Sequence, residues 1–162
     1  LNIFGGKITT YRKLSEHAVD KLVSCFPKAK KAWTKEVPLP GGAFESQESL
    51  VAQLTSDFSW LDNAIAERYA RQYGLLCYKF LKGKASVDAM GIHFGAGMYQ
   101  AEVDYLIECE WACCLEDVIW RRTKHGLRLD KAQQEALSSY ISMKVSGAVQ
   151  SDESVDAVLA SA

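Results

Sequence analysis

The strongest structural signal in this sequence is FGGKITTYRKL, at positions 4–14. Residues 1–4 are typical of the end of a buried strand, and the glycine pair that follows lets a backbone approach a ligand without a Cβ in the way. A helix then begins at Thr9 or Thr10, which are natural N-cap residues. Unpaired N–H groups at the start of a helix favour negative charge, and Lys7 adds a positive charge beside them. The stretch predicts a turn suited to an anion, although many such turns bind nothing.

The residues around this stretch predict one helix and a missing sheet. Apolar residues recur at three- and four-residue spacing after position 10, and Pro27 ends the helix. Residues 1–4 are the one good strand candidate, and a lone strand can neither satisfy its backbone groups nor bury both faces. Residues 1–32 are therefore predicted to be a strand–GlyGly–helix remnant of a domain whose sheet is built elsewhere. The start at Leu1 rather than Met also suggests a piece of a longer protein.

A mainly α domain is predicted after a linker. Residues 33–47 hold two prolines and two adjacent glycines without periodicity, which indicates a linker and a domain boundary. Residues 48–146 show helical periodicity, broken at 83–97 by a glycine-rich stretch of loops with one helical turn. Residues 147–162 are small and acidic and predict a disordered tail. Helices are expected at 47–57, from Asp62 or Asn63 to Gly74, at 75–82, at 98–112, at 114–124, and from Asp130 through Lys144.

Composition narrows the class of protein. The chain has 162 residues, 48% of them hydrophobic and 24% charged, with a formal net charge of -1, which is typical of a globular protein. Such a balance gives no global field to attract nucleic acid or anionic lipid. Five cysteines without a secretory signal suggest reduced thiols in the cytosol. Cys109, Cys113 and Cys114 are interpreted as small core residues and not as a zinc site, and the three histidines lie in no catalytic pattern.

A basic stretch at 120–128 follows the acidic start of its predicted helix. That polarity suits the helix dipole, and Asp117 is placed to pair with Arg121. Gly126 is the expected residue just past the helix end, and Trp120 is predicted to lie in the core. Binding of nucleic acid or of a membrane face is the less favoured interpretation, because the stretch is short and preceded by acids.

The string at 4–14 resembles the FGGK(L/I)TTYRKL segment of aerobic, FAD-dependent (respiratory) glycerol-3-phosphate dehydrogenases. Four further segments resemble that family and follow in the same order along the chain, which argues against chance. The segments are Trp33-Thr34 before PLPGG at 38–42, RYARQYG at 68–74, AEVDYLIECEW at 101–111, and DVIWRRTKHG at 117–126.

The resemblance implies the C-terminal part of an enzyme that oxidises sn-glycerol 3-phosphate to dihydroxyacetone phosphate. FAD is the implied cofactor, and a quinone, or oxygen in oxidase relatives, is the implied electron acceptor. The resemblance places Gly6, Lys7, Ile8 and Thr9 at the flavin, and Lys7 at the substrate as well. The family's adenine-binding glycine motif, its phosphate-binding arginines and its catalytic base lie upstream. This chain alone is therefore expected to hold no catalytic residue and no metal, to bind no FAD and to be inactive.

The resemblance also bears on location and partners. A cytoplasmic protein is expected, with peripheral association at the cytoplasmic face of the inner membrane and a homodimer both left open, and with no nucleic-acid partner. The alternative function is a non-catalytic interaction module, in which the helices of 48–146 dock a partner, a second subunit or a membrane electron acceptor. The sequence leaves open whether residues 120–128 contact the FAD domain, a membrane or solvent.

Overall fold

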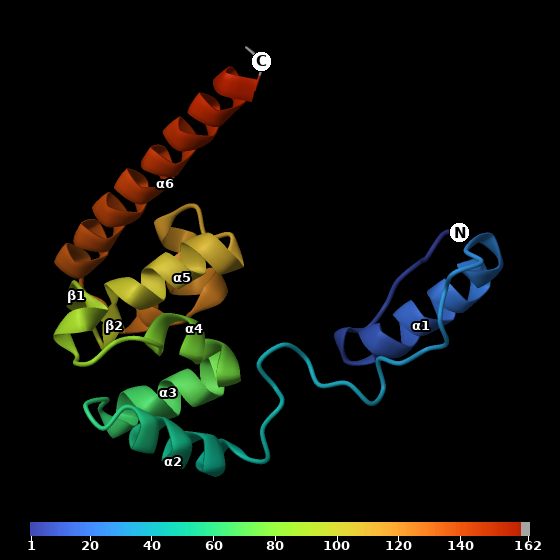
Figure 1. The fold of residues 1–162 in the computed structure, drawn as a ribbon, viewed down its shortest axis with the longest axis horizontal. Helices are drawn as coiled ribbons and strands as arrows, with labels where there is room; N and C mark the ends of the chain where they lie inside the picture. The colour runs from blue at the N-terminus through green and yellow to red at the C-terminus, as the bar shows by residue number, and fades with distance from the viewer. Residues whose placement is uncertain (160–162) are drawn as a thin grey trace. The chain divides into compact units, whose positions relative to one another are not determined.

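A computed structural model describes the backbone of residues 1–159 and the side chains of residues 1–147. The chain divides into two compact units, Leu1–Ala43 and Phe44–Ala162. Figure 1 draws both, and the boundary between them lies within the linker predicted at 33–47, where prolines and glycines interrupt the helical periodicity.

The N-terminal unit consists of one helix flanked by irregular segments (Figure 1). A 3-10 turn, Ile8–Thr10, leads into α1, Tyr11–Leu22, and a second 3-10 turn, Val23–Cys25, ends the helix before Pro27. The predicted helix is thus confirmed. Residues 1–7 have no regular structure, and the described part of this unit contains no strand with which they could pair; a strand at 1–4 stays a prediction for a longer protein that supplies the sheet.

The N-terminal unit has no core of its own. None of the residues of Leu1–Ala43 is buried. The apolar stripe of α1 stays open, with Tyr11 52% and Val19 58% exposed. A contiguous exposed apolar face is typical of a surface that another part of a protein covers; that residues 1–32 are a remnant of a larger domain stays a prediction.

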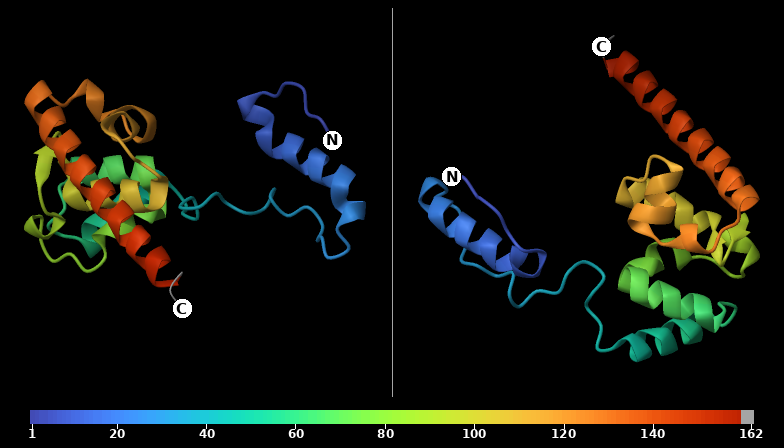
Figure 2. Two further views of the ribbon diagram at one scale, coloured as in Figure 1. Left: turned by 90° about the horizontal axis from the view of Figure 1, so that it is seen from above. Right: turned by 180° about the vertical axis from the view of Figure 1, so that it is seen from behind.

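The second unit is mainly helical and carries one small hairpin (Figure 2). Its helices form where the sequence supplies caps: the Asp62 side chain accepts from the N–H groups of Ala64 and Ile65, and Ser46 forms a capping box with Ser49. Its α-helices and strands are α2 Gln47–Asp57, α3 Asn63–Tyr73, α4 Tyr78–Leu81, β1 His93–Gly95, β2 Met98–Tyr99, α5 Gln100–Glu110 and α6 Lys131–Leu159. Its 3-10 turns are Gly74–Cys77, Asp88–Met90 and His125–Leu127, and its π-helical turn is Asp117–Arg122.

The core of the second unit joins all of its long helices. An aromatic cluster sits where α3, α4 and α5 meet, with ring centroids of Tyr69 and Phe80 5.0 Å apart and those of Phe80 and Tyr105 5.3 Å apart. Further core side chains come from α2, the hairpin, the π-helical turn and the first turns of α6, and they include Leu50, Leu54, Met98, Val118, Ile119, Leu137 and Ile141. This core holds α3, α5 and the segment 117–127 in fixed positions around the site described below.

The structure corrects three local predictions. The stretch 83–97 was expected to hold only loops and one turn, but His93–Gly95 pairs antiparallel with Met98–Tyr99 in a hairpin across a left-handed turn at Ala96 and Gly97. The helix predicted at 114–124 is present but shorter, covering 115–122, and it is π-helical from Asp117 to Arg122. The backbone of α6 remains helical through residues 147–159, where a disordered tail was predicted, since no proline or glycine follows Gly147; residues 160–162 lie outside the described residues.

Two predictions about buried side chains are also wrong. Cys109, Cys113 and Cys114 are exposed, and Cys77 is the buried cysteine. Trp120 is 41% exposed. Small or apolar character alone does not tell which face of α5 or of the π-helical turn meets the core; Trp111, between the two, has a left-handed backbone with φ 57.

Candidate functional site

The segment expected to approach a flavin leads directly into α1. Gly6, with φ 152, is followed by Lys7 and by the 3-10 turn that contains Ile8 and Thr9, and all four residues are exposed. A Cβ on Gly6 would lie 3.2 Å from the Leu14 side chain, so glycine suits this position. Lys7 makes no ion pair with any described side chain, and its carbonyl accepts hydrogen bonds from the N–H and hydroxyl of Thr10.

A polar cluster in the same unit ties the Trp33-Thr34 motif to α1. The Thr34 hydroxyl donates to the Glu16 carboxylate at 2.7 Å, and Arg12 donates to the same carboxylate. The hydrogen bond from Thr34, followed by the nearby positive charges of Arg12 and Lys13, lowers the pKa of Glu16. This cluster orders the chain between α1 and the linker, on the surface of the unit.

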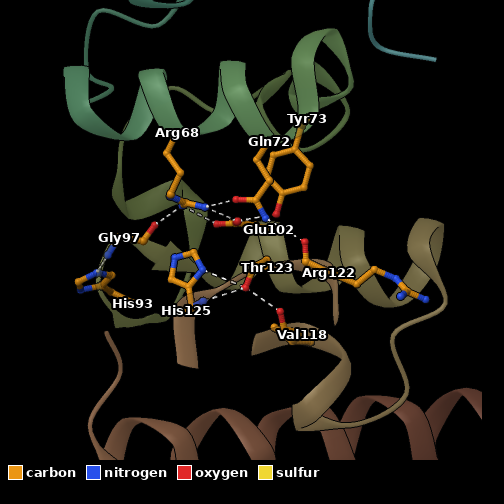
Figure 3. A network of polar contacts seen from close by, with 10 residues as sticks. All are labelled: Arg68, Gln72, Tyr73, His93, Gly97, Glu102, Val118, Arg122, Thr123 and His125. Atoms are coloured by element: carbon orange, nitrogen blue, oxygen red, sulfur yellow. Dashed lines mark hydrogen bonds and ion pairs between the residues drawn. The ribbon is translucent and has the colours of Figure 1, made fainter. Parts of the chain in front are cut away.

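The second unit contains a buried ionic network centred on Glu102 (Figure 3). Glu102 of α5 has no exposed side-chain surface, and its two carboxylate oxygens accept from both terminal nitrogens of Arg68 of α3, at 2.5 and 2.8 Å. The Tyr73 hydroxyl donates to the same carboxylate at 2.6 Å. A bidentate contact between an arginine and a carboxylate is the geometry that best satisfies a buried charge pair.

Arg68 extends the network to the hairpin. Its Nη2 also donates to the carbonyl of Gly97 at 2.8 Å. Burial opposes the charged guanidinium, but hydrogen bonding to Glu102 and its negative charge outweigh burial and raise the pKa of Arg68. Burial, with the charge of Glu102, raises the pKa of Tyr73. Arg68 therefore stays charged and Tyr73 stays a hydroxyl donor, which keeps α3, α5 and the hairpin joined.

The other side of the network reaches the segment after the π-helical turn. Gln72 of α3 donates from Nε2 to the carbonyl of Arg122 at 3.3 Å, and Arg122 donates from Nε to the carbonyl of Glu110 at 2.7 Å. Figure 3 shows Gln72 between Glu102 and this segment. Side chains of α3 thus fix the backbone of 122–125 relative to α5.

The Thr123 hydroxyl determines the tautomer of His125. It donates to the Val118 carbonyl at 2.7 Å, so its oxygen accepts from the His125 N–H at 3.2 Å and faces His125 Nδ1 at 3.1 Å (Figure 3). The ring proton is therefore assigned to Nδ1. Nε2 is buried without a hydrogen bond among the described residues. Burial lowers the pKa of His125, while the charge of Glu102 raises it and those of Arg68 and Arg128 lower it.

Three of the segments singled out in the sequence meet in this network. RYARQYG at 68–74 contributes Arg68, Gln72 and Tyr73, the AEVDYL segment contributes Glu102, and WRRTKHG contributes the backbone and side chains of 122–125. The sequence indicated none of these as site residues, because their partners lie 29, 34 and 50 positions away. The one signal present was the match of whole segments to a known pattern.

The charged groups of this network are paired with each other, and their contacts hold α3, α5 and the hairpin together. Among the described residues no group of three or more His, Cys, Asp or Glu side chains is placed to hold a metal ion. Within that same part of the chain no helix is long and apolar enough to cross a membrane.

Comparison with known proteins finds a matching family model and several similar proteins. A family model described as the C-terminal domain of alpha-glycerophosphate oxidase matches residues 32–146. Similar proteins include a glycerol-3-phosphate dehydrogenase of Pseudomonas aeruginosa, 46% identical over 142 residues, and the aerobic glycerol-3-phosphate dehydrogenase of Escherichia coli, 42% identical over 142 residues. A D-erythritol 1-phosphate dehydrogenase of Brucella abortus is 39% identical over 138 residues.

These matches cover most of this chain and a minor part of each relative. The first two cover 87% of this chain and the third covers 84%, and each match spans 28% of the relative. The matched family model includes the predicted linker and all the residues of the buried network. The chain therefore belongs to the family of the C-terminal domain of alpha-glycerophosphate oxidase.

Proposed function

We propose that the chain is the C-terminal part of an aerobic, FAD-dependent glycerol-3-phosphate dehydrogenase. The complete enzyme oxidises sn-glycerol 3-phosphate to dihydroxyacetone phosphate and passes the electrons to a quinone. The observation that carries the proposal is the FGGKITTYRKL segment, set at the start of α1 ahead of a domain of the matching family. The names of the relatives in Pseudomonas aeruginosa and Escherichia coli support the substrate.

The geometry of residues 5–9 supports the proposal that they approach the flavin. Gly5 and Gly6 both have positive φ, and the backbone there is bare and exposed. Lys7 forms no ion pair with a described side chain, so its ammonium is available to a ligand. When bound, FAD would accept the hydride from the substrate. Lys7, with the N–H groups near the start of α1, would stabilise the negative charge that the flavin gains when it accepts the hydride.

Lys7→Met tests this role in the full-length enzyme, because it removes the charge and nearly keeps the length of the side chain. We expect flavin to stay bound and its reduction by substrate to slow by about two to three powers of ten, the usual scale for losing one such stabiliser. Stopped-flow reduction, normalised to bound flavin, measures this. The matched control is Lys13→Met, in α1, whose ammonium lies 3.5 Å from the Glu16 carboxylate. A normal rate per flavin in Lys7→Met would assign Lys7 to the scaffold instead.

The chain alone is expected to bind no FAD and to oxidise no glycerol 3-phosphate. It lacks the glycine-rich nucleotide motif, and its one sheet is a two-stranded hairpin in the second unit, as far as the described residues extend. A titration with FAD, followed by visible absorbance and by protein-bound flavin after gel filtration, tests this expectation. A stoichiometric yellow complex would contradict it.

A binding role for the helical unit is the second candidate function. The similar domain also occurs in a D-erythritol 1-phosphate dehydrogenase, so the same kind of helical unit accompanies enzymes named for different substrates. That observation favours a role in docking over a role in substrate choice. On this proposal the unit docks a second subunit or an electron acceptor at the cytoplasmic face of the inner membrane. A longer enzyme shortened so that it ends before Phe44 tests this proposal. We expect it to retain flavin and to lose its membrane-bound or dimeric state.

A further inference from the structure

A cationic cleft lies between α3 and the segment 122–128, beside the buried network. It is a concavity of about 580 Å³, within the size range of small-ligand sites. Five positively charged side chains and one acidic side chain, Glu67, line it. The positively charged residues are Arg68, Arg71, Arg122, Lys124 and Arg128.

Most of these positive charges lack a negative partner among the described side chains. Arg68 pairs with Glu102. Arg122 and Lys124 donate to backbone carbonyls, those of Glu110 and Trp120, which carry no charge. No described ion pair or hydrogen bond involves the side chains of Arg71 and Arg128.

The cleft therefore holds an excess of positive charge at a fixed place. The two carboxylates, Glu67 and Glu102, leave three of the five positive charges uncompensated. The wall that carries Lys124 and Arg128 is held by the Thr123 hydrogen bonds and by Trp120, whose ring covers Gly126. Like charges gathered on a rigid wall repel each other, so an anion in the cleft is favoured electrostatically.

We propose that this cleft binds a small phosphorylated ligand through its phosphate group. A phosphate monoester carries nearly two negative charges at neutral pH and matches the excess charge better than one carboxylate does. The guanidinium groups of Arg71 and Arg128, free of other described partners, suit bidentate contacts to phosphate oxygens. The concave shape favours a soluble ligand over a membrane surface, which would contact a flat or protruding face.

Binding of inorganic phosphate and of glycerol 3-phosphate to the 162-residue chain, measured by calorimetry and by amide NMR shifts, tests the proposal. We expect Arg71→Gln and Arg128→Gln each to weaken binding of both ligands about tenfold, the scale of one charge-assisted hydrogen bond. Both residues are exposed and make no described contacts of their own, so folding is expected to persist; thermal unfolding checks this. The control is Arg121→Gln, which removes the same charge from a residue that pairs with Asp117 outside the cleft.

The NMR signal of His125 gives a second readout. The charged groups that act on His125 are Glu102 of α5, Arg68 of α3 and Arg128 of its own segment. A phosphate in the cleft adds negative charge on the side of the two arginines, so bound phosphate raises the pKa of His125. The NMR signals of His17 and His93, which do not line the cleft, should not respond to phosphate.

The outcomes separate the proposal from its rivals. Weaker binding in both arginine variants, normal binding in Arg121→Gln and a shifted His125 titration support it. Equal loss in all three variants would show non-specific attraction and overturn it. So would binding confined to phosphatidylglycerol vesicles, or binding of an acidic polypeptide while inorganic phosphate and glycerol 3-phosphate leave the spectrum unchanged. The proposal does not depend on the flavin chemistry, because Lys7 lies outside the cleft.

Discussion

Glu102 is the residue on which the helical unit depends most at the level of single side chains. Its carboxylate is removed from water, and its stability rests on Arg68 and Tyr73. Taking one partner away from a buried charge leaves a cost of about 3–5 kcal/mol, whereas the intact pair contributes much less than that. The pair thus specifies how α3 and α5 fit together more than it adds to stability.

Tyr73→Phe tests the value of the hydroxyl that faces this carboxylate. The hydrogen bond is buried and 2.6 Å long, so its loss should lower the free energy of unfolding by about 1.5–3 kcal/mol. The control is Tyr78→Phe, which removes a 2.6 Å hydrogen bond to the exposed Asp57 and should cost less than about 1 kcal/mol. Urea denaturation of both variants gives the comparison; equal losses would show that burial of Glu102 is not what matters.

His125 should make stability depend on pH. Burial lowers its pKa below the ordinary 6.5, so the folded state binds fewer protons than the unfolded state as the pH falls through 6.5. Its contribution is fully present above about pH 6.5 and is lost toward the lower, folded-state pKa, by at most about 1.4 kcal/mol per pH unit.

The test compares the pH dependence of denaturation midpoints for three proteins. His125→Asn should flatten the decline between neutral and mildly acidic pH. His17→Asn, which changes an exposed histidine of the N-terminal unit, should keep the wild-type slope. A slope unchanged in His125→Asn would mean that other groups carry the acid sensitivity.

At the level of elements, predictions from sequence succeeded where the signal is local. Asp62 caps α3, and Asp130, where a helix was predicted to begin, forms a reciprocal cap with Gln133, with bonds of 3.0 and 2.9 Å. The predicted Asp117–Arg121 pair is present at 2.8 Å. A cap or a pair four residues apart needs only neighbouring residues, so the sequence contains all the information.

The hairpin and the π-helical turn were not predictable in the same way. The strands at 93–95 and 98–99 have two or three residues each, which is too short for an alternating pattern to appear. Gly126 was expected as the residue past a helix end. The structure shows another reason for it, because a Cβ there would overlap the Trp120 ring. That reason depends on how two turns pack together.

Gly126→Ala therefore tests the packing of the segment 117–127. The added methyl group must displace the Trp120 ring, so we expect a loss of about 1–3 kcal/mol in stability, the usual cost of overpacking. Gly147→Ala is the control: nothing lies within 4 Å of its Cβ, it sits in α6, and alanine there should stabilise by up to about 1 kcal/mol. Chemical denaturation with tryptophan fluorescence measures both. A neutral effect of Gly126→Ala would show that Trp120 swings aside freely.

For the whole molecule, the sequence indicated the family and the boundary but not the site. The matching segments were visible as strings, yet nothing in them states that Arg68, Glu102 and His125 converge. Such convergence depends on contacts across 29 to 50 positions. The same limit explains why Trp120 was assigned to the core, since apolar character alone does not tell which ring stays partly exposed.

Removal of residues 1–43 tests the division into two units. Every buried residue among those described lies in the second unit, from Leu50 to Ile141. We expect the shortened chain to show the same thermal midpoint as the complete one within about 1 °C. Circular dichroism during heating measures this. A clear fall in the midpoint would show that the N-terminal unit stabilises the helical one.

The Arg68–Glu102–Tyr73 network also constrains how this domain can change over evolutionary time. Loss of any one member leaves a polar or charged group unpaired in the interior. A lineage that changes only one of these residues therefore passes through a poorly folded ancestor. Replacement of the whole set by apolar residues of similar size removes that barrier, because no unsatisfied group remains. Descendants should therefore carry either the complete ionic set or a fully apolar one, and mixtures of the two should be rare.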